Sequence, residues 1–185
     1  MMGTRLALVL TLAFAVSCMN PNRKEAPPGK VAEPPAPTGA MTITSPAFAN
    51  GGAIPQKYTC NGTAVSPPLD FNNVPQNAGS LALEVTDPDA PSGTFAHWLV
   101  WNIPTSITRF KEDDVPAGVI QGLNGFGKNN YGSPCPPSGV HHYLFDLYAL
   151  DNTLGLPASK GREDFENAIK GHVVAHAQLT GLYGK

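Results

Sequence analysis

Two carboxylates held close together by proline are the first residues whose spacing points to chemistry. Residues 87–91 have the sequence Asp-Pro-Asp-Ala-Pro, so Asp87 and Asp89 flank one proline and Pro91 follows. Because each proline ring fixes its own φ, the directions of the two carboxylates are set with little conformational entropy left to lose. Such carboxylates can orient an imidazole, and together with His97 they have the residue types needed for general acid–base chemistry.

A second polar segment is also rich in proline and leads into a histidine and a tyrosine. Residues 131–139 have the sequence Tyr-Gly-Ser-Pro-Cys-Pro-Pro-Ser-Gly, and His141 and Tyr143 follow. Imidazole and phenol groups can donate hydrogen bonds to an anion. Because binding residues are often carried by loops on a rigid scaffold, we expect these two stiff segments to form walls of one small site.

The segments that must position these residues are predicted to be strands. Residues 81–85 and 97–103 are short apolar runs that end next to proline, which is typical of buried strands. Residues 141–150 alternate with a period of two. His141 and Tyr143 are therefore expected on one face of a strand, and the adjacent His142 on the other.

The rest of the chain favours a mainly β domain with one late helix. Residues 162–170 have the apolar spacing of a short helix, and residues 173–179 alternate like a final strand. The 185 residues include 19 glycines and 19 prolines, which favours turns and short strands over a helix bundle. The formal net charge of −2 argues against nucleic-acid binding, because the chain has no excess of cations for phosphate backbones.

The N-terminus has the layout of a secretory signal peptide. Arg5 precedes an apolar run over residues 6–16, which is shorter than the roughly 20 residues needed to span a bilayer. Residues 15–18, Ala-Val-Ser-Cys, resemble the lipobox of bacterial lipoproteins, in which the cysteine is lipidated. We therefore expect a lipoprotein-type signal peptide over residues 1–17, export to the bacterial cell envelope and membrane association through Cys18. Ordinary cleavage nearby, which leaves Cys18 unmodified, is the alternative.

A proline-rich segment separates this signal from the folded part of the chain. Residues 18–40 contain six prolines among small and charged residues, which is typical of an extended tether. Residues 41–185 are then the folded domain. If Cys18 is lipidated, Cys60 and Cys135 are the remaining cysteines, and in an exported protein we expect them to form a disulfide. Two buried free cysteines are the alternative.

In these motifs the chain resembles the phosphatidylethanolamine-binding protein family, also called Raf kinase inhibitor protein-like, and in particular its bacterial branch. The motifs that carry the resemblance are residues 58–62 (Tyr-Thr-Cys-Asn-Gly), 66–69 (Ser-Pro-Pro-Leu), 87–91, 97–98 (His-Trp), 102–104 (Asn-Ile-Pro), 124–128 and 134–137 (Pro-Cys-Pro-Pro). The resemblance covers nearly all of residues 41–185. It implies a mainly β fold, a β-sandwich with a large antiparallel sheet and a short C-terminal helix, and a small surface pocket for anionic groups.

The resemblance also implies which residues bind the ligand. They are Asp87, Asp89, His97, His141 and Tyr143, with Gly132 and Pro134 at one rim. Because ionised aspartates repel phosphate, we expect the two histidines and the tyrosine to hold it. The aspartates would then orient the imidazoles or meet an ammonium group, and a phosphoethanolamine headgroup carries both charges.

Two positions depart from the family pattern. The family usually has His-Arg-Tyr where this chain has His141, His142 and Tyr143. Since position 142 faces away from position 141, we expect this change to affect packing or the surface more than the pocket. Ser133 stands where glycine is common, and serine tolerates a positive φ poorly.

The function predicted from these residues is that of a binding or regulatory module for a small anionic or zwitterionic ligand such as phosphate or phosphoethanolamine. The alternatives are an inhibitor of a kinase or protease that acts through a protein partner, and a weak phosphoester hydrolase. The chain has no Gly-x-Ser-x-Gly motif and the resemblance assigns no nucleophile, so we predict no enzyme activity and no catalytic residue. No cofactor is expected. His172 and His176 have the spacing of a zinc-binding helix, but the glutamate of that motif is missing and in a strand the two imidazoles would not converge, so no metal is expected either.

Overall fold

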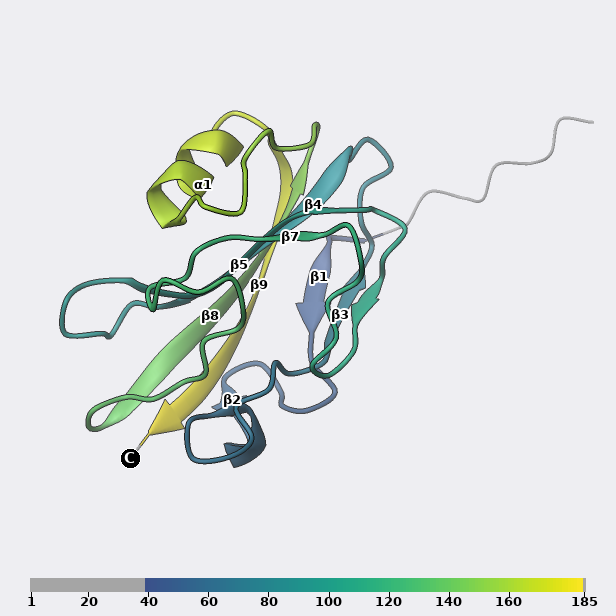
Figure 1. Ribbon diagram of the computed structural model, residues 1–185. Helices are drawn as coiled ribbons and strands as arrows, with labels where there is room; N and C mark the ends of the chain where they lie inside the picture. Colours follow the sequence, from purple (N-terminus) through teal and green to yellow (C-terminus); the bar gives the residue numbers. More distant parts are fainter. Residues whose placement is uncertain (1–38, 185) are drawn as a thin grey trace, which may run out of the picture. The chain divides into compact units, whose positions relative to one another are not determined.

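Strands make up most of the regular structure in the computed structural model, which describes residues 39–184 (Figure 1). The predicted signal peptide, the lipidation site Cys18 and all of the predicted tether except its last two residues lie outside the described residues. The first strand begins at Thr42, next to the predicted start of the domain at residue 41.

Nine strands, one short 3-10 helix and one α-helix form along this part of the chain. In order they are β1 (Thr42–Thr44), β2 (Gly52–Ala53), η1 (Gln56–Tyr58), β3 (Leu69–Asn72), β4 (Ser80–Asp87), β5 (Phe95–Ile103), β6 (Arg109–Phe110), β7 (Ile120–Gln121), β8 (Val140–Leu150), α1 (Arg162–Ile169) and β9 (Val173–Gly184).

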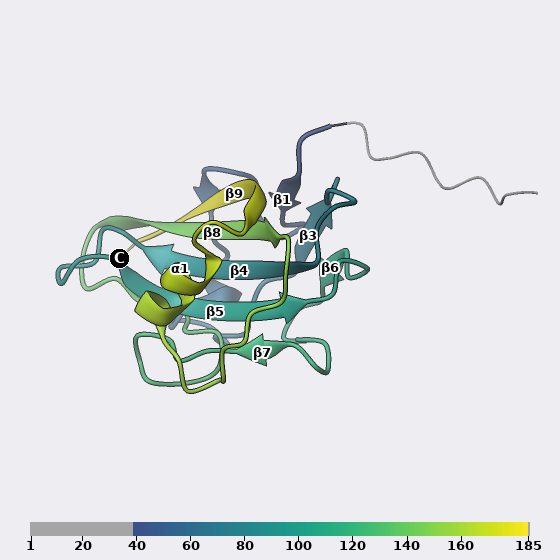
Figure 2. The same cartoon turned by 90° about the horizontal axis from the view of Figure 1, so that it is seen from above.

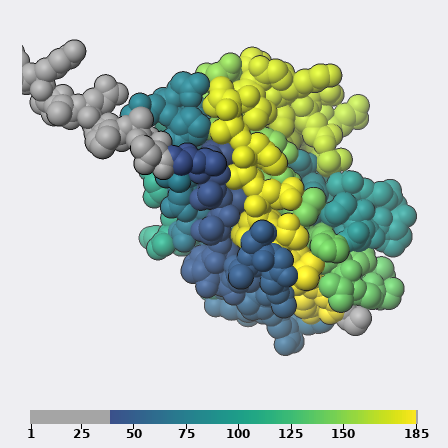
Figure 3. Space-filling view, turned by 180° about the vertical axis from the view of Figure 1, so that it is seen from behind, coloured from purple at the N-terminus to yellow at the C-terminus, as the bar shows by residue number. Residues whose placement is uncertain are grey.

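The strands form two sheets. The large sheet has the order β2-β9-β8-β4-β5-β7, and the small sheet has the order β1-β3-β6. All pairs are antiparallel except β2 with β9, which is parallel. The large sheet is thus antiparallel, as predicted, apart from this one short parallel pair at its edge, which makes it mixed. Figure 3 shows this edge from behind, with β9 in yellow running beside blue segments from the N-terminal part of the domain.

Both faces of the large sheet are covered, which explains why its central strand β4 is buried along its whole length. All eight residues of β4 are buried. The small sheet covers one face, and the core between the sheets includes Ile43, Phe71, Leu83, Trp98, Phe110 and Phe145. Helix α1 lies on the other face (Figures 1 and 2), where Phe165 and Ile169 pack against a second core that includes Ala82, Leu99 and Trp101. The domain is therefore a β-sandwich with one short C-terminal helix, as predicted.

The antiparallel arrangement brings the ends of three neighbouring interior strands together at one end of the large sheet. Strand β4 ends at Asp87, and its two neighbours β5 and β8 begin at this same end. Asp87 pairs with Phe95 across β5, and Thr86 pairs with Leu144 across β8. The predicted strands that carry Asp87, His97, His141 and Tyr143 are thus adjacent in space.

Candidate functional site

A cavity of about 360 Å³ opens at this end of the sheet, where strand β4 ends and strands β5 and β8 begin. Its walls combine polar side chains from the strand ends with apolar side chains from the loops. The lining residues are Asp87, Ala90, Pro91, Ser92, Phe95, His97, Phe126, Cys135, Pro136, Pro137, His141 and Tyr143. Four of the residues expected in the pocket, Asp87, His97, His141 and Tyr143, therefore lie around one cavity, whereas Asp89, Gly132 and Pro134 do not line it.

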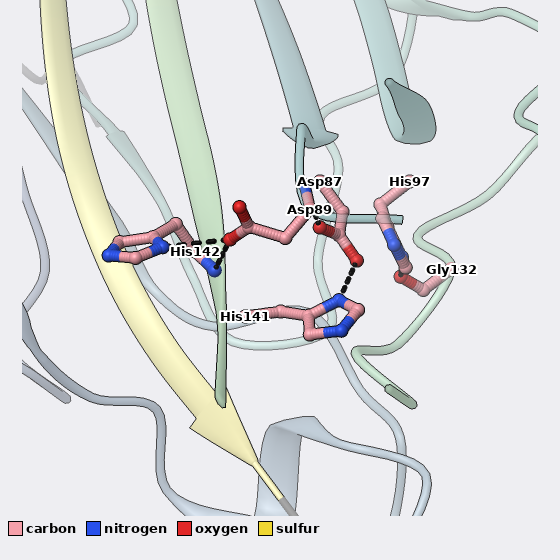
Figure 4. A network of polar contacts seen from close by, with 6 residues as sticks. All are labelled: Asp87, Asp89, His97, Gly132, His141 and His142. Carbon is pink, nitrogen blue, oxygen red and sulfur yellow. Dashed lines mark hydrogen bonds and ion pairs between the residues drawn. The ribbon is translucent and has the colours of Figure 1, made fainter. Parts of the chain in front are cut away.

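Asp87 and His141 form a buried pair at the cavity wall (Figure 4). Nδ1 of His141 lies 2.7 Å from Oδ2 of Asp87, and the two side chains are only 10% and 5% exposed. Because an ionised carboxylate can only accept, Nδ1 carries a proton and donates a hydrogen bond to Asp87. The other ring nitrogen, Nε2, is left for a group inside the cavity.

His97 is held in the same way by a backbone carbonyl. Its Nδ1 donates to the carbonyl oxygen of Gly132 at 2.7 Å, and the N–H of Gly132 donates to the carbonyl oxygen of His97 at 2.8 Å. Burial lowers the pKa of His97, although the Gly132 carbonyl and the nearby Asp87 act in the opposite direction. The ring is therefore neutral at pH 7, and its Nε2 has a lone pair until it takes up a proton.

Gly132 lies outside the cavity but determines the position of its wall. A Cβ atom at this residue would come within 2.7 Å of the Phe126 ring and 3.0 Å of the His97 carbonyl oxygen. Only glycine lets the chain approach both groups this closely. The neighbouring Ser133 does not have a positive φ, so its side chain imposes no backbone strain on the rim.

Tyr143 brings a buried hydroxyl to the cavity. Its side chain is fully buried and its ring meets the His97 ring edge-on at a centroid distance of 5.2 Å. The hydroxyl completes no hydrogen bond with another described residue, although the backbone of Cys135 is close enough to lower its pKa. Burial, with Asp87 as a second cause, raises the pKa of Tyr143 well above its ordinary value. The phenol therefore stays protonated and can donate to a ligand.

An aromatic wall lies beside these polar groups. Phe95 contacts His97 at a centroid distance of 5.0 Å and Phe126 at 4.8 Å, and Phe126 is 54% exposed. Phe95 could have been predicted, because it lies two residues before His97 in the same strand and so shares its face. Phe126 comes from a loop, and no periodic pattern in the sequence indicates it.

Asp89 points away from the cavity and binds the outer side of β8 (Figure 4). Its Oδ2 accepts hydrogen bonds from the backbone N–H and from Nδ1 of His142, both at 2.8 Å. These bonds lower the pKa of Asp89, and the bond from the backbone N–H of His142 has the larger effect. His141 is buried and His142 is exposed, as the alternation of β8 predicts.

The wall formed by residues 135–137 is fixed by a disulfide. Cys60 and Cys135 are bonded, with their Cα atoms 5.4 Å apart, which confirms the predicted pairing. The backbone N–H of Cys60 also donates to the carbonyl of the buried Pro134 at 3.0 Å. Pro134 therefore acts through the chain that it anchors rather than by lining the cavity.

The remaining histidines have protein partners elsewhere. His172 pairs with Asp151 at 2.8 Å, and His176 pairs with Asp146 at 2.7 Å. Among residues 39–184 no cluster of three or more histidine, cysteine or acidic side chains is arranged to hold a metal ion. The same residues include no helix that is long and apolar enough to cross a membrane.

Comparison with known proteins places this geometry in a family. The family model described as phosphatidylethanolamine-binding protein matches residues 44–184. A UPF0098 protein of Methanothermobacter thermautotrophicus is 47% identical over 148 residues, which cover 77% of this chain and 98% of that protein. A UPF0098 protein of Chlamydia pneumoniae is 45% identical over 150 residues, which cover 78% of this chain and 99% of that protein.

Solved structures give the same result. The crystal structure of a phosphatidylethanolamine-binding protein homologue from Chlamydia trachomatis is 41% identical in sequence and matches with a TM-score of 0.76 over 80% of this chain and 99% of that one. E. coli YbcL, described as a member of the mammalian family, is 29% identical and has a TM-score of 0.75 over the same shares of the two chains. The chain belongs to the phosphatidylethanolamine-binding protein family.

Proposed function

We propose that the cavity binds the oxyanion group of a small ligand, such as a phosphate or a phosphoethanolamine headgroup, and that the protein is a binding or regulatory module. Membership of the family supports a binding role in general. The specific ligand class rests on the chemistry of the cavity.

One observation carries this proposal: polar groups around the cavity have hydrogen-bonding capacity that the protein itself does not use. His97 and His141 each spend Nδ1 on a protein acceptor, and Tyr143 has a buried hydroxyl without a completed bond. Buried polar groups in proteins are usually satisfied, so an unsatisfied one needs an explanation. A tetrahedral oxyanion has enough oxygens to accept from all three side chains.

The protonation states predict how such binding depends on pH. In the neutral rings Nε2 has a lone pair, which repels an oxyanion, and it donates only after it is protonated. Because the pKa of His97 is lowered in the free protein, that ring is neutral at pH 8 and gains its second proton only as the pH falls below its ordinary range. Anion binding should therefore be tighter at pH 6 than at pH 8 and should take up a proton.

The cavity favours binding over hydrolysis. Ser92 is the hydroxyl nucleophile that lines it, but none of the hydrogen bonds among residues 39–184 joins Ser92 to either cavity histidine. A serine nucleophile needs a base within hydrogen-bond reach.

Calorimetric titration of residues 39–185 with phosphoethanolamine, inorganic phosphate and sulfate at pH 6 and pH 8 tests the proposal. Sulfate is the control for the ligand's own titration, since it stays fully ionised over this range. We expect all three to bind more tightly at pH 6, and we expect His141→Gln to weaken each by about tenfold or more, because a hydrogen bond to a charged group is lost.

His172→Gln is the matched control for that variant. His172 is also paired with an aspartate through Nδ1, but it is exposed and is not part of the cavity. Affinity equal to wild type is expected for His172→Gln. Absence of binding heat with all three anions at both pH values would contradict the proposal.

We also propose that the protein is exported and anchored to the bacterial cell envelope through lipidated Cys18. The disulfide supports export, because such bonds persist in oxidising compartments. Labelling of the full-length protein with a radioactive fatty acid tests the anchor. Label is expected on the wild type and not on Cys18→Ala, and an unlabelled wild type would contradict it.

A further inference from the structure

The pair formed by Asp89 and His142 lies outside the cavity, but hydrogen bonds connect it to the buried pair of Asp87 and His141 at the cavity wall. The two side chains are 42% and 55% exposed, and the carboxylate of Asp89 is directed at β8 rather than at the cavity. Asp89 Oδ2 accepts from both the backbone and the ring of His142. Two bonds on one oxygen tie the turn after β4 to the start of β8.

The backbone of Asp89 continues this connection to the cavity. Its N–H donates to Oδ1 of Asp87 at 2.9 Å, while Oδ2 of Asp87 accepts from Nδ1 of His141. Both oxygens of Asp87 are therefore occupied, and the plane of its carboxylate is fixed by one bond on each side. Figure 4 shows the resulting chain of contacts from His142 through Asp89 and Asp87 to His141.

The alternation of β8 explains why two carboxylates are needed. His141 points into the cavity and His142 points out of it, so adjacent residues of one strand present their rings on opposite sides. Asp87 accepts a hydrogen bond from the His141 ring, and Asp89 accepts one from the His142 ring. The stiff turn over residues 87–91 is thereby held against the strand from both faces, which restricts the direction of the His141 ring.

We propose that Asp89 is a positioning residue, which acts through His142 and Asp87 to fix the direction of His141 Nε2 and so strengthens oxyanion binding in the cavity. This inference rests on the proposed function, because it concerns the same cavity. It differs from a direct role of Asp89 in holding a ligand's ammonium group. A misdirected hydrogen-bond donor loses much of its strength, so loss of Asp89 should weaken binding without removing any cavity side chain.

The decisive variant is Asp89→Ala, studied with two probes. Because the effect acts through His141, inorganic phosphate and phosphoethanolamine should both lose about fivefold to tenfold in affinity. Asp89→Asn keeps one oxygen for the backbone N–H of His142, and His142→Ala keeps that N–H but removes the ring. Both should lose about twofold to fourfold in affinity for each probe.

Asp151→Ala is the matched control. Asp151 forms an exposed pair with Nδ1 of His172 at 2.8 Å, the same ring nitrogen and distance as in the pair of Asp89 and His142. We expect this variant to bind both probes with wild-type affinity. Equal affinity of Asp89→Ala and wild type for phosphate would overturn the proposal. So would a loss confined to phosphoethanolamine, because that result would place Asp89 on the ammonium group.

Nitrogen-15 spectra of the histidine rings in the protein without ligand separate this proposal from the proposed function. We expect Asp89→Ala to change the Nδ1 and Nε2 resonances of His141, with smaller changes in His142→Ala and none in Asp151→Ala. Unchanged His141 resonances in Asp89→Ala would reject the positioning role even if the cavity binds anions. If no anion binds the wild type but these resonances change, the positioning holds and the proposed function fails.

Discussion

Strands β4 and β8 contribute to two clusters of polar side chains, and each cluster contains an aspartate–histidine pair. One lies at the cavity, and the other, which we call the mid-sheet group, contains Asp146 and His176. At one end of the sheet, Asp87 binds His141, whose ring is buried at the cavity. In the middle of the sheet, Asp146 binds His176, whose ring is 44% exposed and stacked on Tyr148. The two nitrogen–oxygen distances are both 2.7 Å, so bond length does not distinguish them.

The difference lies in what surrounds each pair. In the mid-sheet group, Oδ1 of Asp146 accepts a second bond from Gln178. Glu84, which lies directly opposite Asp146 on β4, is bonded to Arg162 of α1 at 2.8 Å. The protein thus supplies donors for the carboxylates of this group. At the cavity, the Tyr143 hydroxyl and two imidazole Nε2 atoms are not used in this way. Hydrogen-bonding groups that are buried at a cavity and not used by the protein, rather than the aspartate–histidine pair itself, therefore distinguish the candidate binding site.

The largest effect is expected from the disulfide, which fixes a wall at the cavity and has no counterpart in the mid-sheet group. Replacing both Cys60 and Cys135 by serine opens a loop with a sequence separation of 75 residues. The free energy of unfolding should fall by about 4 kcal/mol, measured by urea denaturation. Wild type measured with a reductant should show the same loss, and a loss below about 1 kcal/mol would show that the wall is held by other contacts.

A break in the mid-sheet group should affect stability and leave the cavity intact. Arg162→Ala leaves the buried Glu84 without its cation and should lower the free energy of unfolding at pH 7.5 by about 2 kcal/mol, at the low side of buried pairs because Arg162 is partly exposed. Phosphate affinity should not change. A variant that loses stability and affinity together would contradict the separation of the two regions.

The same variant has a pH dependence whose sign follows from Glu84. Burial raises the pKa of Glu84 above its ordinary value, and Arg162 opposes this shift. The folded protein therefore binds more protons than the unfolded one between the ordinary and the raised pKa, and Glu84 lowers stability as the pH rises through that window. Without Arg162 the pKa rises further, so the stability lost in Arg162→Ala should be larger at pH 7.5 than at pH 4.5.

A smaller loss is expected where the cavity wall is closely packed. In Gly132→Ala the added methyl group meets the Phe126 ring and the His97 carbonyl, so one of them must move. Overpacking of this kind should lower the free energy of unfolding by about 1 to 2 kcal/mol. Phosphate affinity should also fall, because the carbonyl that orients His97 belongs to the same residue. Gly155→Ala, where a Cβ meets no atom within 4 Å, is the control and should change neither quantity measurably.

The smallest change in stability, and one of opposite sign, is expected at Tyr143. Its hydroxyl is buried without a completed bond, so Tyr143→Phe should leave the free energy of unfolding unchanged or raise it by up to about 1 kcal/mol. The same variant should bind phosphate about fivefold to tenfold more weakly. Loss of stability in Tyr143→Phe, measured by thermal unfolding without ligand, would show that the protein already uses this hydroxyl.

The sequence predicts the long elements of the fold and misses the short ones for a physical reason. Strands β4, β5 and β8 and helix α1 have apolar patterns long enough to recognise, and they begin and end within two residues of the predictions. Strands of two residues, such as β2 and β7, have no period to detect. The parallel pairing of β2 with β9 depends on contacts between residues far apart in the chain, so no local pattern predicts it.

For the site, the sequence predicts residue types better than directions. The alternation of β8 correctly separates His141 from His142. The spacing of Asp87 and Asp89 around a proline does not determine which carboxylate faces the cavity, because that depends on where the His142 ring and backbone lie. Phe126 reaches the cavity from a loop in which the side chain of Asn124 accepts from the backbone N–H of Phe126 and of Lys128, and such long-range placement has no local sequence pattern.

Binding of an oxyanion by His97 and His141 is tested most directly by a phosphate titration that is followed through the ring nitrogen resonances of all five histidines. At pH 6.5 we expect the Nε2 resonances of His97 and His141 to move together toward the protonated form, while those of His172 and His176 stay in place. Movement of His176, or saturating phosphate without any change at His97 and His141, would contradict the assignment of these two cavity histidines to ligand binding.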